Sequence, residues 1–142
     1  LMLYMASRAQ LAAEVIRPAL ERGGCVLCDR WVSATIAYQG AGGADAEQVR
    51  GVARVAVGDL AEPDLTLLLD LPAEDGLARQ AGRSPDRMEA KAIEFHRRVR
   101  ELFLAQAEAD AERFAVVDAA GAPEEVQRKL RDAVKQWAGA ND

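Results

Sequence analysis

The chain has 142 residues, of which half are apolar and 29% are charged, and its formal net charge is -5. This length and balance suit a single globular domain that buries a substantial core. They disfavour a protein that coats nucleic acid, because neutralising phosphates requires a basic face. No apolar stretch is long enough to span a bilayer, and the first apolar residues lack the preceding basic region of a signal peptide.

The first predicted element is a helix over residues 1–22, where apolar side chains recur at helical spacing. Pro18 lies inside it and should kink the helix or start a new turn, and the glycine pair that follows should end it. A short apolar strand is expected over residues 25–29. Residues 30–39 are then expected to form a loop that leads into a helical stretch.

Two cysteines, Cys25 and Cys28, lie in the predicted first strand. Side chains three residues apart on a strand point to opposite faces of the sheet, so these thiols would not meet. The single histidine, His96, and the lack of further cysteines leave no set of zinc ligands. We therefore expect buried, reduced thiols and a cytoplasmic protein.

Further along the chain, Asp45 followed by Gln48 resembles a capping box and predicts that a helix begins there. Apolar strands are expected over residues 65–70 and 114–118. The other helices are expected after Pro72, through residues 93–103 and from Pro123. Strands that alternate with helices indicate βαβ units, so the sequence predicts an α/β fold with a doubly wound parallel sheet in one domain, residues 1–142.

Each predicted strand ends in an aspartate, at Asp29, Asp70 and Asp118. Ligands of such sheets bind outside the carboxyl ends of the strands, which makes these side chains candidates for chemistry. Each of them alone is equally suited to cap the turn that follows its strand.

The segment from Asp29 to Gly40 carries the most chemical groups. It begins with an adjacent carboxylate and guanidinium and continues with hydroxyl, amide and aromatic side chains. Phosphoryl transfer uses this mixture, because it depends on positioning and on neutralising charge. The guanidinium of Arg30 suits phosphate and the carboxylate of Asp29 suits Mg²⁺ or its waters. The residue types alone favour a plainer interpretation, in which the Asp–Arg pair caps a loop.

This segment, DRWVSATIAYQG, resembles the signature of bacterial thymidylate kinases, in which Asp-Arg-aromatic is followed by a serine and by Ala-Tyr-Gln-Gly. Further matches occur in order and with the family's spacing, at YMASRAQ (4–10), VIRPALERG (15–23), PDLTLLLD (63–70), DRME (86–89) and FHRRV (95–99). The resemblance implies a P-loop nucleoside-monophosphate-kinase-like fold with flanking helices and an arginine-containing lid at about residues 79–87. It also implies phosphoryl transfer from ATP to dTMP, in dTTP biosynthesis, and a homodimer.

The resemblance assigns roles in binding dTMP. The implied contacts are Tyr4 (thymine ring), Arg8 (thymine carbonyl), Thr35 (N3 edge), Arg30 (phosphate), Tyr38 (sugar) and Gln39 (base or sugar). From the residue type alone, Tyr4 would be assigned to core packing. Trp31 replaces the family's commoner tyrosine, phenylalanine or histidine, and we expect it to pack without a chemical role.

For ATP, the implied contacts are Arg79, Arg83 and Arg87 in the lid and Ala119 and Ala120 in the loop beside adenine. Arg83 is favoured as the lid residue that reaches the transferred phosphoryl, which makes Asp29, Arg30 and Arg83 the catalytic set. The three lid arginines also suit an ordinary solvated helix face. For Mg²⁺, the resemblance implies Asp29, acting through water, and the acidic positions Asp86 and Glu89.

No GxxxxGK(S/T) phosphate-binding loop occurs in this sequence. The resemblance places that loop upstream of Leu1, after a strand in the middle of the sheet, and a domain without this strand would have a gap through its core. We therefore expect an N-terminally incomplete sequence that is inactive by itself.

Two other hypotheses remain from the sequence. One is another P-loop nucleotide or deoxynucleoside kinase, which Arg8 and residues 35–39 disfavour. The other is a non-catalytic kinase-like fragment that binds a protein partner, supported only by the missing loop. Neither nucleic acid nor a membrane is expected as a partner.

Overall fold

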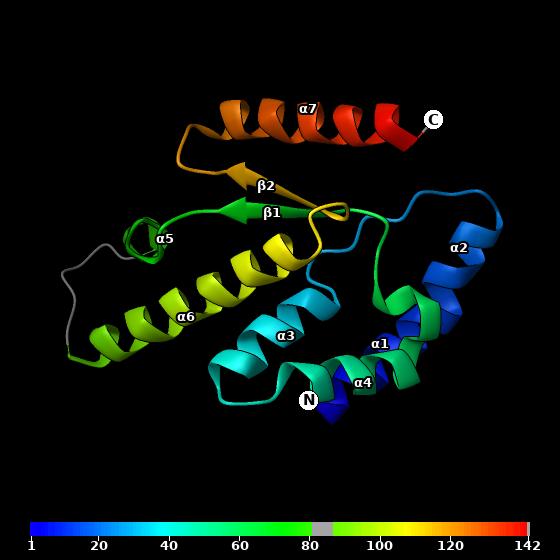
Figure 1. The fold of residues 1–142 in the computed structure, drawn as a ribbon, viewed down its shortest axis with the longest axis horizontal. Helices are drawn as coiled ribbons and strands as arrows, with labels where there is room; N and C mark the ends of the chain where they lie inside the picture. The colour runs from blue at the N-terminus through cyan, green and yellow to red at the C-terminus, as the bar shows by residue number, and fades with distance from the viewer. Residues whose placement is uncertain (81–86, 142) are drawn as a thin grey trace. The chain divides into compact units, whose positions relative to one another are not determined.

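The computed structural model describes residues 1–80 and 87–141, with side chains placed for all of these except 80, 87–91 and 141. The chain divides into two compact units, Leu1–Pro63 and Asp64–Asp142 (Figure 1). The prediction of a single domain stays a prediction, and each unit is described by itself below.

The first unit is helical. Its elements are α1 (Met2–Leu11), the π-helix η1 (Ala12–Ile16), α2 (Arg17–Glu21), α3 (Val32–Ala41), α4 (Ala46–Val57) and the 3₁₀-helix η2 (Gly58–Ala61). Both α1 and α3 pack against α4. The core between them contains Met5, Trp31, Val32, Ile36 and Val49, together with Ala12, Ile16, Ala53, Val57 and Ala61.

The first 21 residues form one almost continuous helical run, as the sequence predicts, and Pro18 explains its interruption. Proline lacks an N–H and its ring crowds the carbonyl four residues earlier. The helix widens to the π form over Ala12–Ile16, and α2 then begins one residue before Pro18. Gly23, at φ +75°, ends the run. The next residue is also a glycine, Gly24, and a side chain would not fit there, because a Cβ would lie 2.8 Å from the carbonyl oxygen of Ala19.

The start of α4 is also confirmed. Asp45 is its N-cap, and the side chain accepts a hydrogen bond from the backbone N–H of Gln48 at 2.8 Å. This bond satisfies one of the donors that every helix leaves free in its first turn. Because α3 begins at Val32, most of the segment that was expected to start as a loop, residues 30–39, is helical.

The predicted strand over residues 25–29 is wrong. Residues 25–28 have no regular secondary structure and Asp29 lies at a bend, because no segment of the described chain pairs with them. A strand is stable only when a neighbour accepts and donates its backbone hydrogen bonds. The predicted burial of Cys25 and Cys28 is wrong for the same reason: both thiols are free and exposed, and the neighbouring Leu27 is 93% exposed.

The second unit contains the other two predicted strands, β1 (Thr66–Asp70) and β2 (Phe114–Asp118). They are parallel neighbours, with Thr66 opposite Phe114 and Asp70 opposite Asp118. The crossover between them consists of α5 (Ala73–Gln80) and α6 (Arg87–Ala109), and α7 (Pro123–Asn141) follows β2. This unit is therefore a βαβ arrangement with a helix added, as the alternation of strands and helices predicts.

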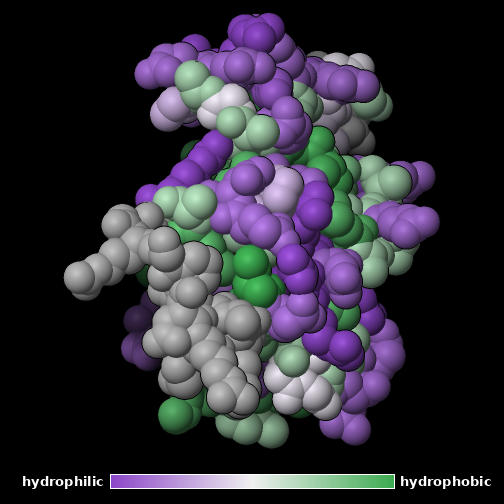
Figure 2. Space-filling view, turned by 90° about the vertical axis from the view of Figure 1, so that its left-hand side faces the viewer, coloured by the Kyte–Doolittle hydropathy of each residue, from purple (hydrophilic) through white to green (hydrophobic). Residues whose placement is uncertain are grey.

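The long helices α6 and α7 both pack on the strand pair, which lies between them in Figure 1. The outward side of α7 is mainly hydrophilic, as the upper part of Figure 2 shows. No helix among the described residues is both long and apolar enough to cross a membrane.

Candidate functional site

The first unit brings together two side chains that lie 27 residues apart in the sequence. Nη1 of Arg8, on α1, donates a hydrogen bond to the hydroxyl oxygen of Thr35, on α3. Nη2 of Arg8 donates to the carbonyl oxygen of Trp31 at 2.8 Å, and the guanidinium lies 5.6 Å from the centre of the Trp31 ring. Thr35 is buried, and the bond from Arg8 gives its hydroxyl the polar partner that a buried polar group requires.

Burial lowers the pKa of Arg8, and the nearby Cys28 and Tyr4 oppose that shift. Arginine stays protonated in proteins, so this side chain remains a partly buried cation. Tyr4 lies one helical turn before Arg8 on the same face of α1. Tyr4 is 61% exposed, which excludes the core packing that the residue type alone suggested.

Arg30 has the only positive φ among the described non-glycine residues, at 60°. This left-handed conformation costs an L-residue roughly 1–2 kcal/mol. The guanidinium lies over the ring of Tyr38 on α3, 5.2 Å from its centre, and an exposed stack of this kind contributes about 0.5–1 kcal/mol. The stack therefore offsets about half of this cost at the centre of both ranges. Strain that local contacts do not explain is concentrated at functional sites.

The remaining candidates of this unit are less constrained. Gln39 is half-buried on α3, one residue after Tyr38. Asp29 is exposed at the bend before Arg30. Within residues 1–80 and 87–141, no group of three histidine, cysteine, aspartate or glutamate side chains could hold a metal ion.

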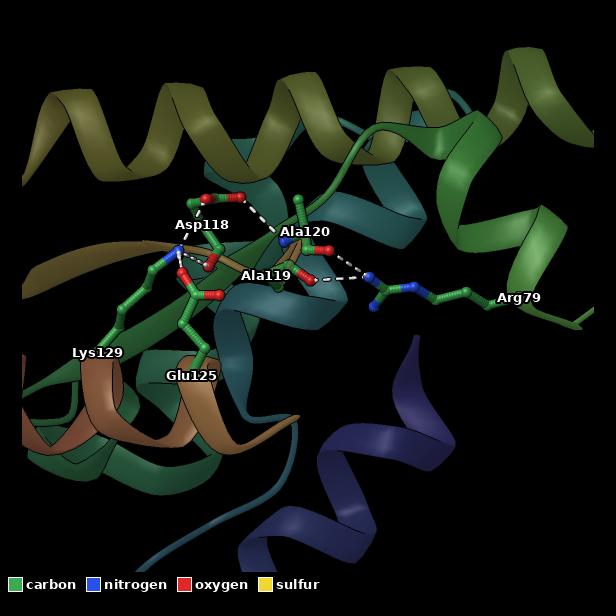
Figure 3. A network of polar contacts seen from close by, with 6 residues as sticks. All are labelled: Arg79, Asp118, Ala119, Ala120, Glu125 and Lys129. Carbon is green, nitrogen blue, oxygen red and sulfur yellow. Dashed lines mark hydrogen bonds and ion pairs between the residues drawn. The ribbon is translucent and has the colours of Figure 1, made fainter. Parts of the chain in front are cut away.

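In the second unit the candidates Arg79, Ala119 and Ala120 meet (Figure 3). Nη2 of Arg79, near the end of α5, donates to the carbonyl oxygens of Ala119 at 3.1 Å and Ala120 at 3.0 Å, in the loop after β2. The predicted lid residues Arg83 and Asp86 lie outside the described residues. Arg87 and Glu89 lie in the first turn of α6, without described side chains.

Two of the three strand-end aspartates have structural partners. Asp118 accepts a hydrogen bond from the backbone N–H of Ala120 at 2.9 Å, which is the turn-capping role that the sequence allowed. Asp70 makes a two-pronged contact with Arg100, with Nε–Oδ1 at 2.6 Å and Nη2–Oδ2 at 2.8 Å. The hydrogen bonds from Arg100 lower the pKa of Asp70 from its usual range.

Replacing Asp70 by asparagine should lower the free energy of unfolding by about 1–2 kcal/mol at pH 7, because Arg100 loses a charged acceptor. A carboxyl whose pKa is lowered by folding stabilises the protein above its unfolded pKa, and this contribution disappears as pH falls through the folded pKa. The difference between wild type and variant should therefore shrink as urea unfolding is repeated from pH 7 down to pH 3. Asp132→Asn, at an exposed position on α7, is the control and should leave the free energy of unfolding at pH 7 within about 0.5 kcal/mol of wild type. Equal losses for both variants would contradict the role of the pair.

Sequence reasoning missed two residues of these clusters, Trp31 and Lys129. Trp31 was expected only to pack, and it does so, but its ring and carbonyl also hold Arg8. Lys129, on α7, contacts the carboxylate of Asp118 at 2.9 Å. No local pattern marks either contact, because each joins residues that are at least 11 positions apart.

Comparison with known proteins adds a family relationship. The family model for thymidylate kinase matches residues 1–130. The thymidylate kinases of Desulfovibrio desulfuricans and Deinococcus radiodurans are 47% and 48% identical to this chain, and the matches cover 96% and 95% of it. These matches cover 67% and 66% of the two relatives. The thymidylate kinase of Thermomicrobium roseum is 51% identical over 88% of this chain and 60% of its own length. The chain thus spans between 60% and 67% of the length of these three relatives.

Proposed function

The chain belongs to the thymidylate kinase family, and from this premise we propose that the protein transfers a phosphoryl group from ATP to dTMP, giving dTDP and ADP. The observation that carries the proposal is the hydrogen bond between Arg8 and Thr35, beside the exposed ring of Tyr4. A cation, a hydroxyl and an aromatic face from two helices form a set that can recognise a pyrimidine base.

The hydrogen-bonding capacity of this set matches thymine. A guanidinium has five N–H donors and a hydroxyl oxygen has two lone pairs, so Arg8 and Thr35 keep capacity for a ligand beyond the bonds they make with the protein. Arg8 donates to a thymine carbonyl, Thr35 accepts from N3–H, and Tyr4 stacks on the ring. In cytosine, an amino group, which is a donor, replaces one of the two carbonyls of thymine. Its N3 carries no hydrogen and is an acceptor, so cytosine fits this set of side chains poorly.

Arg30 binds the dTMP phosphate in this proposal. Its planar fork of donors matches phosphate oxygens, and the stack on Tyr38 limits the directions in which the guanidinium can point. Tyr38 also lies beneath the sugar, and Gln39 contacts the base or sugar. Transfer is direct and in line, with no covalent enzyme intermediate, because positioning and charge neutralisation provide the catalysis.

On the ATP side, Arg79 and the carbonyls of Ala119 and Ala120 border the adenine. Mg²⁺ suits the carboxylate of Asp29, because this ion is usually held by one or two carboxylates together with substrate phosphates and water. When bound, Mg²⁺ would neutralise charge on the phosphates. The roles of Arg83, Arg87, Asp86 and Glu89, the homodimer and the cytoplasmic location stay predictions.

A coupled ADP-release assay of the full-length protein with ATP–Mg²⁺ tests the proposal. We expect kcat/KM for dTMP to exceed that for dCMP by at least about 10²-fold, because dCMP leaves polar groups of the site unpaired. The advantage over dUMP, which lacks only a methyl group, should be about tenfold. A preference for thymidine over dTMP would contradict the proposal, since the acceptor would then be a nucleoside.

A further inference from the structure

We propose that Lys129 is a positioning residue that orients the last residue of β2 and the loop after it, together residues 118–121, for the base of the phosphoryl donor. The inference rests on the proposed function, since it concerns the ATP side of the same reaction. Lys129 lies on α7 and is not among the residues that the family resemblance singles out.

Lys129 connects α7 to the beginning of the loop. Its ammonium nitrogen lies 2.9 Å from Oδ2 of Asp118 and 3.3 Å from the carbonyl oxygen of the same residue. It also lies 3.3 Å from Oε1 of Glu125, one turn earlier on α7. Figure 3 shows these contacts on one side of the loop and Arg79 on the other. The ammonium thus holds the side chain and the backbone of Asp118 at once.

Asp118 passes this constraint to the next residues. Its second carboxylate oxygen, Oδ1, accepts from the backbone N–H of Ala120, and the N–H of Ala119 donates to the carbonyl of Asp70 at 2.8 Å. The N–H groups of Ala119 and Ala120 are therefore both used within the protein. The carbonyl oxygens of Ala119 and Ala120 are left to face Arg79.

At the other end of the loop, the backbone of Gly121 lies close to the carboxylate of Glu125. A Cβ at Gly121 would lie 2.5 Å from Oε2 of Glu125, so a larger residue would displace this carboxylate. Glu125 is also a partner of Lys129. Lys129 thus holds Asp118 at one end of the loop, and its partner Glu125 lies close to Gly121 at the other end.

This arrangement determines which hydrogen bonds the loop can offer. Each carbonyl oxygen has two lone pairs, so Ala119 and Ala120 can accept one more bond besides that from Arg79. The exocyclic amino group of adenine is a donor and suits these acceptors, whereas the O6 of guanine is an acceptor and does not. Lys129 holds the loop in the orientation that presents these carbonyl acceptors. It therefore favours binding of a 6-aminopurine triphosphate over binding of a guanine nucleotide.

The test compares Lys129→Met, the conservative variant Lys129→Arg and the control Lys135→Met, at an exposed position on the same helix. We expect Lys129→Met to raise KM for ATP about fivefold, the upper range for an exposed ion pair, and to reduce the ratio of kcat/KM for ATP to that for GTP. KM for dTMP should not change, and the melting temperature should fall by at most about 8 °C, as expected for the loss of one exposed ion pair. Lys129→Arg should recover most of the ATP affinity, and Lys135→Met should behave as wild type.

An unchanged KM for ATP in Lys129→Met would overturn the inference, and so would an equal rise in KM for dTMP or a fall in melting temperature of more than about 8 °C, which would indicate a general loss of stability. Wild-type protein that does not phosphorylate dTMP would instead contradict the proposed function. In that case, calorimetric binding of ATP and GTP to wild type and to Lys129→Met decides the role of the loop independently of turnover. A threefold or smaller change in ATP affinity there would again overturn it.

Discussion

Replacing Arg30 by methionine is expected to lower kcat/KM for dTMP by about 10²–10³-fold, the usual effect of removing a charged group that binds the reacting phosphate. Methionine keeps a long flexible stem but neither binds phosphate nor carries charge. Because Arg30 is exposed, the fold should tolerate the change. The measurement is steady-state ADP release with dTMP varied at saturating ATP.

A matched comparison separates a phosphate role from a general effect. Arg22→Met changes another exposed arginine of the same unit and should leave kcat/KM within about twofold of wild type. Thymidine lacks the phosphate, so its calorimetric affinity should be equal for wild type and Arg30→Met. If Arg30→Met keeps kcat/KM within threefold of wild type, or if it weakens thymidine and dTMP equally, Arg30 does not bind the phosphate.

Replacing Trp31 by leucine should give the largest loss of stability, about 3 kcal/mol in the free energy of unfolding. Trp31 is 8% exposed in the core of the first unit, and its indole N–H donates to the carbonyl of Leu60 at 2.6 Å. The variant leaves a cavity and a carbonyl without its donor. Urea unfolding, followed by far-ultraviolet circular dichroism, measures the change.

Trp31→Phe divides this effect into two parts. Phenylalanine keeps an aromatic ring but cannot donate to Leu60, so we expect a loss of about 1–2 kcal/mol. Because the ring also lies against Arg8, KM for dTMP should rise more in Trp31→Leu than in Trp31→Phe. Stability equal to wild type in both variants would show that the Trp31 contacts do not hold this unit together.

Local signals in the sequence determined most of the helices and two strands. Asp45 caps α4, Gly23 ends the first helical run, and Pro18 marks the place where that run changes register. Each of these effects acts through residues within about one helical turn, so a sequence pattern contains the whole cause. The apolar runs of β1 and β2 predicted both strands. The prediction is confirmed because these two segments pair with each other.

The tertiary structure alone decided where residues far apart in the sequence meet. The apolar segment with Cys25 and Cys28 satisfied the pattern of a strand, but it has no partner among the described residues, and both thiols are exposed. The same dependence on packing explains why the sequence could name Arg8 and Thr35 only by family resemblance and could not show that they touch. It also explains why Lys129 was missed. A strand ladder, a buried hydroxyl and an ion pair between elements each require a second segment at a set distance, and that distance is a property of the packed fold.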